Sequence, residues 1–259
     1  MKKSRFSIRQ IVGELLLTAG VLLLLFAFYE AYWTNVESGK LQDQARAELD
    51  DTWRNPRQQL NPELGEAFAR MYIPSFGADF EFAIVEGTED EALLRGPGHY
   101  TGTQMPGEVG NFAVAGHRVG KGAPFNDLGA LQACDAIVVE TASQWVTYRV
   151  LPMAGRQPQE LDCFSTEQQD KLQGEYAQAY GRHITVPGDI GVLEPVPSLS
   201  DAPATEAILT LTTCHPQFSN AERMIVHAME VETLPKTGSA VDARADQGRP
   251  AALDEIGEK

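Results

Sequence analysis

The chain has 259 residues, enough for one sizeable domain with accessory segments. Asp and Glu outnumber Lys and Arg by 36 to 21, which gives a formal net charge of −15 at neutral pH. This balance argues against a nucleic-acid partner, because binding of phosphates requires a basic surface.

A basic start precedes a long apolar run at the N-terminus. Residues 1–10 carry a charge of +4, and the charged residues of the run 11–33, Glu14 and Glu30, lie near its two ends. As a helix this run would span about 34 Å, enough to cross a bilayer core. Its aromatic residues gather at the far end: Tyr29, Tyr32 and Trp33.

The basic flank predicts a single-pass signal-anchor over 11–33 in the cell membrane. Residues 1–10 would be cytoplasmic, and everything after Trp33 would be extracellular. A cleaved signal peptide is disfavoured, because its apolar region would be shorter and no small-residue cleavage site precedes Trp33.

Residues 34–69 are rich in Gln, Asp, Glu and Arg, and they predict an extracellular stalk that is partly helical around 41–53. From residue 70 onward, short apolar runs alternate with turn residues. We expect strands at 70–77, 80–86, 111–115, 136–140, 145–151, 184–186, 207–213 and 224–231, and short helical pieces at 89–94 and 125–131. Many short strands with few helices predict a mostly β domain over 70–233, built as a closed barrel.

Two segments depart from this pattern. Residues 155–182 are polar and weakly periodic, and they predict an insertion with an amphipathic helix over 168–180. Residues 234–259 lack apolar periodicity and predict a disordered tail. The odd number of cysteines leaves at least one free. Cys134 and Cys163 could pair, but the sequence does not show whether their Cα atoms are close enough, and we do not favour that pair.

Cys214 lies at the end of a predicted strand, where Pro216 stops the run. Arg223 opens the next strand, and a hairpin would bring the two residues side by side. A thiol next to a fixed cation has a lowered pKa and becomes a nucleophile. The alternative is a small buried cysteine with a surface arginine nearby.

His117 is the histidine best placed to serve as a base. Strand alternation puts it on the same face as Ala113 and Ala115, and Gly116 before it leaves open access. The other four histidines are placed less well. His215 follows the cysteine and points to the opposite face, and His227 lies inside an apolar strand, as expected of a core residue. His183 borders the insertion, and His99 lies in a Gly/Pro-rich loop. His99, from its loop, could contact substrate.

No metal or cofactor is predicted. The pair Cys214-His215 lacks the second Cys or His pair that zinc spacing requires.

Two motifs carry a resemblance to a known family. The segment TLTTCHP around Cys214, followed by Arg223 in ERMIVHA, resembles the active-site signature of sortases, the cysteine transpeptidases of Gram-positive surfaces. Upstream, GPGHYTGTQMPGEVGNFAVAGHR over 96–118 resembles the segment that carries the sortase histidine. The sequence of this segment is most similar to the class E type of high-GC actinobacteria, and the similarity covers about 70–231.

This resemblance implies an eight-stranded closed barrel and a set of roles. Cys214 would be the nucleophile, His117 the acid and base, and Arg223 a donor to the substrate or the oxyanion. Tyr100, Thr213 and His99 would contact the substrate. The partners would be surface proteins with a C-terminal LPxTG- or LAxTG-type motif, cleaved between Thr and Gly, and a cell-wall precursor or pilin amine as acceptor.

Other hypotheses stay open. An L,D-transpeptidase also uses Cys and His, although a Ser-His-Gly-Cys type of site is expected there. A catalytically silent surface scaffold would keep the barrel alone. In the tail, Leu234 to Gly238 spells Leu-Pro-Lys-Thr-Gly, which could bind in trans in the groove of a neighbouring molecule or be an inert tag.

Overall fold

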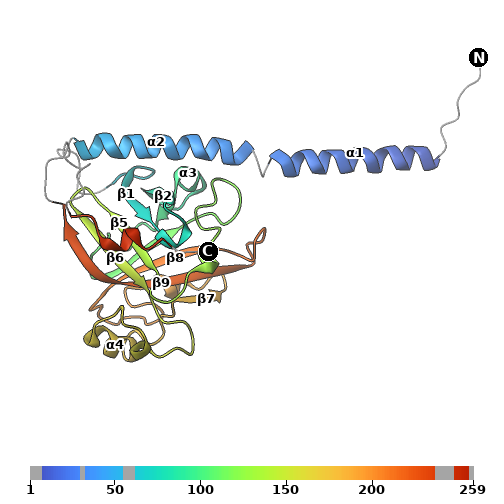
Figure 1. The fold of residues 1–259 in the computed structure, drawn as a ribbon. Coiled ribbons are helices and arrows are strands. Elements are labelled where there is room, and N and C mark those ends of the chain that lie inside the picture. The colour runs from blue at the N-terminus through green and yellow to red at the C-terminus, as the bar shows by residue number, and fades with distance from the viewer. Residues whose placement is uncertain (1–7, 30–32, 55–61, 237–247, 257–259) are drawn as a thin grey trace, which may run out of the picture.

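The computed structural model describes residues 8–29, 33–54, 62–236 and 248–256. Figure 1 shows a β-barrel with helix α2 (Thr34–Arg54) along one side and helix α1 (Ile8–Phe28) projecting away from it. Helix α1 has no buried residue, and within the described ranges it is the one helix long and apolar enough to cross a membrane. It covers most of the run 11–33, whose residues 30–32 lie outside the described ranges.

The strands form one sheet that closes on itself. In chain order they are β1 (Ala67–Tyr72), β2 (Glu81–Glu86), β3 (Gly98–His99), β4 (Gly110–Ala115), β5 (Ala136–Glu140), β6 (Gln144–Val150), β7 (Arg182–Thr185), β8 (Ala207–His215) and β9 (Glu222–Pro235). Their spatial order is β6-β5-β1-β2-β3-β4-β8-β9, and the β6–β9 pairing closes these eight strands into a ring. Strand β7 pairs with the first part of β9. The expected closed eight-stranded barrel is therefore confirmed.

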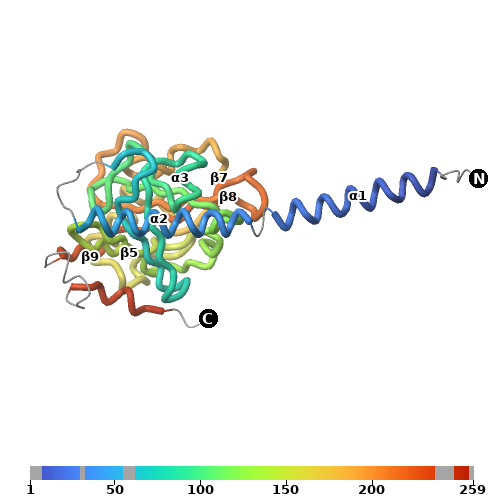
Figure 2. The backbone as a smooth tube through the Cα atoms, turned by 90° about the horizontal axis from the view of Figure 1, so that it is seen from above, coloured from blue at the N-terminus to red at the C-terminus, as the bar shows by residue number. Residues whose placement is uncertain are grey.

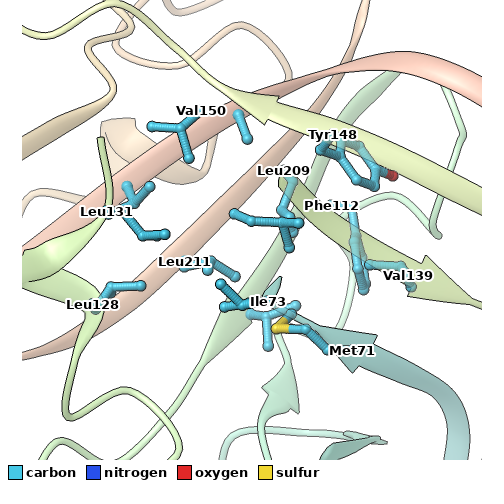
Figure 3. Close-up of a cluster of buried hydrophobic side chains, with 14 of the residues drawn as sticks. Met71, Ile73, Phe112, Leu128, Leu131, Val139, Tyr148, Val150, Leu209 and Leu211 are labelled. Carbon is cyan, nitrogen blue, oxygen red and sulfur yellow. The ribbon is translucent and has the colours of Figure 1, made fainter. Parts of the chain in front are cut away.

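The interior of the barrel is filled by the inward-facing residues of alternate strand positions. On β4 these are Phe112 and Val114, and on β8 they are Leu209 and Leu211, all fully buried. Figure 3 shows Phe112, Leu209 and Leu211 packed with Met71 and Ile73 at the core. The period of two along β4 and β8 consequently sends the alternate residues, Cys214 among them, to the outer face.

Short helices and 3₁₀ turns connect the strands of the barrel or flank it. They are α3 (Asp90–Arg95), α4 (Thr166–Gln173) and 3₁₀ turns at Pro74–Phe76, Leu128–Ala130, Pro158–Glu160, Ile190–Leu193 and Ala251–Asp254. Helix α4 starts where Ser165 and Gln168 form a capping box, and it ends at Gly174, so it is shorter than the helix expected over 168–180.

A disulfide joins Cys134 to Cys163, with the two Cα atoms 5.8 Å apart. Our preference against this pair was wrong. The insertion folds back on the barrel, where Phe164, Leu172 and Tyr176 share a buried cluster with Leu151. That long-range packing, which local sequence does not encode, brings the two cysteines within bonding reach.

Helix α2 lies on the barrel, whereas we expected residues 34–69 to form a stalk. Ala45 and Leu49 are fully buried and pack with Ala67 and Val85 of the sheet. Figure 2 shows α2 crossing over the barrel. The buried stripe of the helix is Ser38, Gln42, Ala45 and Leu49, spaced as one helical face. Because half of this stripe is polar, composition alone hides it.

The expected disordered tail is wrong for two of its parts. Strand β9 runs to Pro235, with Leu234 and Pro235 paired to β6, and Lys236 N donates to Ser143 O at 2.8 Å. Further on, Ala252 and Leu253 are buried against Ala136 and Val138 of β5. The first three residues of the Leu-Pro-Lys-Thr-Gly segment are thus part of the barrel, while Thr237 and Gly238 lie outside the described residues.

Candidate active site

Cys214 and Arg223 face each other across the β8–β9 hairpin. They are direct partners in the antiparallel register, so their side chains leave the same face of the sheet. Cys214 is a free, half-buried thiol. The hairpin adjacency expected from the sequence is confirmed in the backbone register.

His117 follows the neighbouring parallel strand. Ala115 of β4 pairs with Thr212 of β8, and Gly116 N donates to Thr212 O at 3.0 Å. The Thr213 hydroxyl donates to Gly116 O at 2.7 Å, which extends the join by one more residue. If the same parallel register continues for two more residues, His117 lies opposite Cys214.

The imidazole of His117 has a buried nitrogen, Nε2, without a hydrogen-bond partner in the described residues. Burial, and secondarily the charge of Lys121, lower the pKa of His117 below its ordinary value, whereas Asp90 raises it. The lowered pKa favours the neutral imidazole, the form that can accept a proton as a general base must.

Gly116 is required beside His117. A Cβ on Gly116 would lie 2.5 Å from Cδ2 of Phe125, so any other residue would displace the Phe125 ring. Phe125 N also donates to His117 O at 3.0 Å, which ties the loop back onto the histidine. Gly116 therefore allows the close approach of Phe125, a contact that the sequence does not reveal, and the expected open access is not found, because Nε2 of His117 is buried.

Arg118 is a residue of this site that the sequence reasoning missed. Its Nη1 donates to His215 Nδ1 at 2.6 Å and lies 3.3 Å from Cys214 O. His215 Nδ1 must then accept, so the ring hydrogen is on Nε2, which faces Glu222 at 3.9 Å. Arg118 therefore links the segment after His117 to the end of β8. Its position directly after the predicted histidine was the available signal.

Arg223 is held by its own hairpin. Its Nη1 donates to Asn220 O at 3.1 Å and to Glu222 O at 3.0 Å. A guanidinium has five donors in a planar fork, so these two bonds fix its position and leave donors that can bind an incoming group.

Of the three expected substrate contacts, one remains at an accessible position. Tyr100 is half-buried, and its hydroxyl bonds Thr212 Oγ1 at 2.8 Å on the outer face of β8. Thr213 is buried and its hydroxyl donates to Gly116 O, while its expected contact with substrate stays a prediction.

The expected place of His99 in a loop is wrong, whereas its contact with substrate stays a prediction. His99 lies in β3 and is 2% exposed. Its Nδ1 is 2.6 Å from Glu86 Oε2, and its Nε2 is 2.9 Å from Thr103 Oγ1. Pairing of β3 with β2 and β4 draws this Gly/Pro-rich segment into the sheet, which buries the ring.

His227 is the core histidine that its apolar strand predicts. It is fully buried, with Nδ1 2.9 Å from Thr210 Oγ1. The Thr210 hydroxyl donates to Asn111 Oδ1, so Nδ1 of His227 carries the ring hydrogen. Burial first, and His183 second, lower the pKa of His227 to about 3. Its place inside the fold excludes it as the base for Cys214.

Comparisons with known proteins agree on one family. A model described as "Sortase domain" matches residues 71–231. Sortase SrtE1 of Streptomyces coelicolor is 35% identical over 240 residues, which cover 90% of this chain and 60% of that protein. This chain therefore matches only about 60% of the length of that curated relative.

Solved structures show the same similarity. The SrtF sortase from Corynebacterium diphtheriae is 58% identical with a TM-score of 0.71, covering 78% of this chain and 98% of that one. Sortase E1 from Streptomyces coelicolor, with a tripeptide in its active site, is 29% identical with a TM-score of 0.54, covering 74% and 99%.

Proposed function

We propose an activity for this chain from one premise: it belongs to the sortase family, because the family model matches residues 71–231. The proposed activity is that of a membrane-anchored cysteine transpeptidase acting on sorting-motif peptides. The observation that supports it best is the pairing of Cys214 with Arg223, with the unpartnered Nε2 of His117 just past the end of the neighbouring strand β4.

The first half-reaction forms an acyl-enzyme. His117 takes the thiol proton, and the Cys214 sulfur attacks the carbonyl carbon of the substrate Thr. The Thr–Gly amide bond breaks, the leaving Gly amine takes the proton from His117, and a thioester remains. The free donors of Arg223 would stabilise the oxyanion of the tetrahedral intermediate.

The second half-reaction transfers the acyl group. An acceptor amine attacks the thioester carbon and gives its proton to His117. The C–S bond breaks, a new amide forms, and Cys214 is released as the thiol once it regains the proton. The acceptor would be a cell-wall precursor or a pilin amine, and the donor would carry an LPxTG- or LAxTG-type motif.

The proposed location is the cell membrane, with the N-terminus cytoplasmic and the catalytic domain outside. Support comes from the apolar helix α1, which is long enough to span a bilayer, and from the basic residues before it. Binding of the tail motif in trans would require Leu234 to Lys236 to leave the barrel, so we assign that segment no role in catalysis.

The test uses the full-length chain in detergent micelles with peptides of the LPxTG and LAxTG kinds, followed by mass spectrometry. Cys214→Ala should abolish cleavage between Thr and Gly, and His117→Ala should lower the rate by at least ~10²-fold. His183→Ala, a change at a half-buried histidine outside this constellation, is the matched control and should keep its activity. Intact cleavage in Cys214→Ala would refute the proposal.

A further inference from the structure

The loop that follows His117 has an unusual backbone. Four successive residues, 120–123, have φ angles of 62°, 51°, 80° and 38°. Two of them, Lys121 and Ala123, carry a Cβ, for which left-handed backbone is disfavoured. One hydrogen bond, from Ala123 N to Gly120 O at 2.8 Å, closes the turn. Such a conformation persists where surrounding groups hold it in place.

Those surrounding groups come from helix α2. The Ser38 hydroxyl lies 2.7 Å from Leu94 O and 2.8 Å from Lys121 O, so its one hydrogen is shared between two carbonyl oxygens. Ser38 is fully buried. One turn earlier in the helix, Asn35 Oδ1 accepts the Gly122 N–H at 2.9 Å.

The fit between helix and loop is close. A Cβ on Gly122 would lie 2.4 Å from Nε2 of Gln42 and 3.1 Å from Oγ of Ser38. Three neighbouring residues of one α2 face, Asn35, Ser38 and Gln42, therefore meet the left-handed turn directly. The rest of that face, Ala45 and Leu49, packs on the sheet and fixes the helix axis.

The turn 120–123 is also connected to His117. Phe125 N donates to His117 O, so residues 117–125 form a loop closed at its base, and the turn 120–123 is the part that α2 holds. Lys121, whose carbonyl Ser38 binds, also acts electrostatically on the imidazole of His117. Displacement of this turn would move both the backbone and the charge next to His117.

We propose that Ser38 and Asn35 of α2 are positioning residues, which hold the turn 120–123 and through it His117 for acid–base catalysis. This inference rests on the proposed function, since it takes His117 as the acid and base. It gives α2, the first helix after α1, a part in setting the catalytic rate. The competing view is that α2 only stabilises the fold.

The experiment compares Ser38→Ala with Glu37→Ala in the full-length chain in detergent micelles. Glu37 is the exposed neighbour on the same helical turn and serves as the matched control. With the LPxTG or LAxTG peptide that the wild type cleaves, Ser38→Ala should lower kcat by about tenfold with KM within twofold, because misplaced catalytic groups cost rate rather than binding. Glu37→Ala should change neither.

Two readouts besides turnover separate positioning from folding. Hydrogen exchange of the peptide that covers 118–125 should speed up in Ser38→Ala, because the carbonyl anchor of the turn is gone. Alkylation of Cys214 by iodoacetamide should slow together with kcat, because iodoacetamide reacts with the thiolate and the base that takes the thiol proton is misplaced. If Ser38→Ala does not fold, Asn35→Ala, at an exposed position, should show the same accelerated exchange and a smaller loss of kcat.

Wild-type kcat in a folded Ser38→Ala, or unchanged exchange of 118–125, would overturn the inference. Equal losses in Glu37→Ala would also overturn it, because the effect would then not depend on the turn. His117→Ala distinguishes failure of the proposed function from failure of the role of α2. Full activity in His117→Ala would remove the proposed acid–base role itself, whereas an inactive His117→Ala with an unaffected Ser38→Ala would remove only the role of α2.

Discussion

Acidification should destabilise this domain through His227, a residue with no part in catalysis. The ring is fully buried, its Nδ1 bonds Thr210, and its Nε2 has no partner within the described residues. Burial, with a smaller effect of His183, lowers the pKa of His227 to about 3. A proton on this ring would add a charge that the surroundings do not compensate.

The sign and size of the effect follow from proton linkage. In the unfolded chain the imidazole titrates at its ordinary value of 6.5, so below this pH the unfolded state binds a proton that the native state refuses. The free energy of unfolding therefore falls as the pH drops from 6.5 towards 3, and this contribution levels off below that. At pH 5 the loss is about 2 kcal/mol, from roughly 1.5 pH units at ~1.36 kcal/mol each. This figure is insensitive to the native pKa as long as that pKa stays below about 4.

The assay compares the wild type with His227→Asn. Asparagine places an amide N–H near the position of Nδ1, where it can donate to Thr210, and it does not titrate. Urea unfolding in detergent micelles at pH 7.5 and pH 5.0, followed by tryptophan fluorescence, gives the free energy of unfolding for each chain. His227→Asn starts less stable, because it leaves a cavity, but between the two pH values it should lose about 2 kcal/mol less than the wild type. His117 and His183 titrate in both chains, so their contributions cancel. Equal losses in the two chains would refute this account of His227.

Three further changes test other parts of the structure. Replacing Cys134 and Cys163 together with alanine removes a cross-link across 29 residues of sequence and should lower the free energy of unfolding by about 3–4 kcal/mol in urea; an unchanged value would mean that the insertion is held without it. Arg223→Lys should lower kcat/KM of peptide cleavage at least ~10-fold, because lysine keeps the charge but loses the planar fork; near-normal cleavage would show that charge alone suffices. Lys236→Ala removes an ion pair with Glu140 at 2.7 Å and contacts with two tryptophan rings, and should cost about 1–2 kcal/mol of stability in urea; no loss would indicate that the end of β9 is not fastened there.

The barrel could be predicted because its signals are local. Strand β5 begins and ends where the apolar run 136–140 does, and the alternation along β4 gives the correct inward face. The pairing of Cys214 with Arg223 was also predictable, since a short hairpin fixes its own register. The place of His117, just past the end of β4, was predictable too.

What the sequence did not reveal depends on contacts between distant segments. His99 looks like a loop residue because Gly and Pro surround it, yet β3 pairs with two strands and buries it. Helix α2 looks like a solvated stalk because Ser38 and Gln42 are polar, yet their partners are carbonyl oxygens and a glycine of a loop about 80 residues away. Polar residues in a buried stripe are the part of a pattern that hydrophobic periodicity cannot detect.

The two faces of β8 explain why Cys214 is held firmly in place. One face supplies Leu209 and Leu211 to the core, which sets the depth and tilt of the strand. On the other face, Thr210 bonds Asn111 and His227, and Thr212 bonds Tyr100. At the end of the strand, the backbone of Cys214 meets the Arg118 guanidinium. Every second residue is thus fixed from outside while its neighbours are fixed from inside. A slip of one residue would exchange the leucines for threonines in the core, so the burial that stabilises the barrel also holds the thiol opposite Arg223.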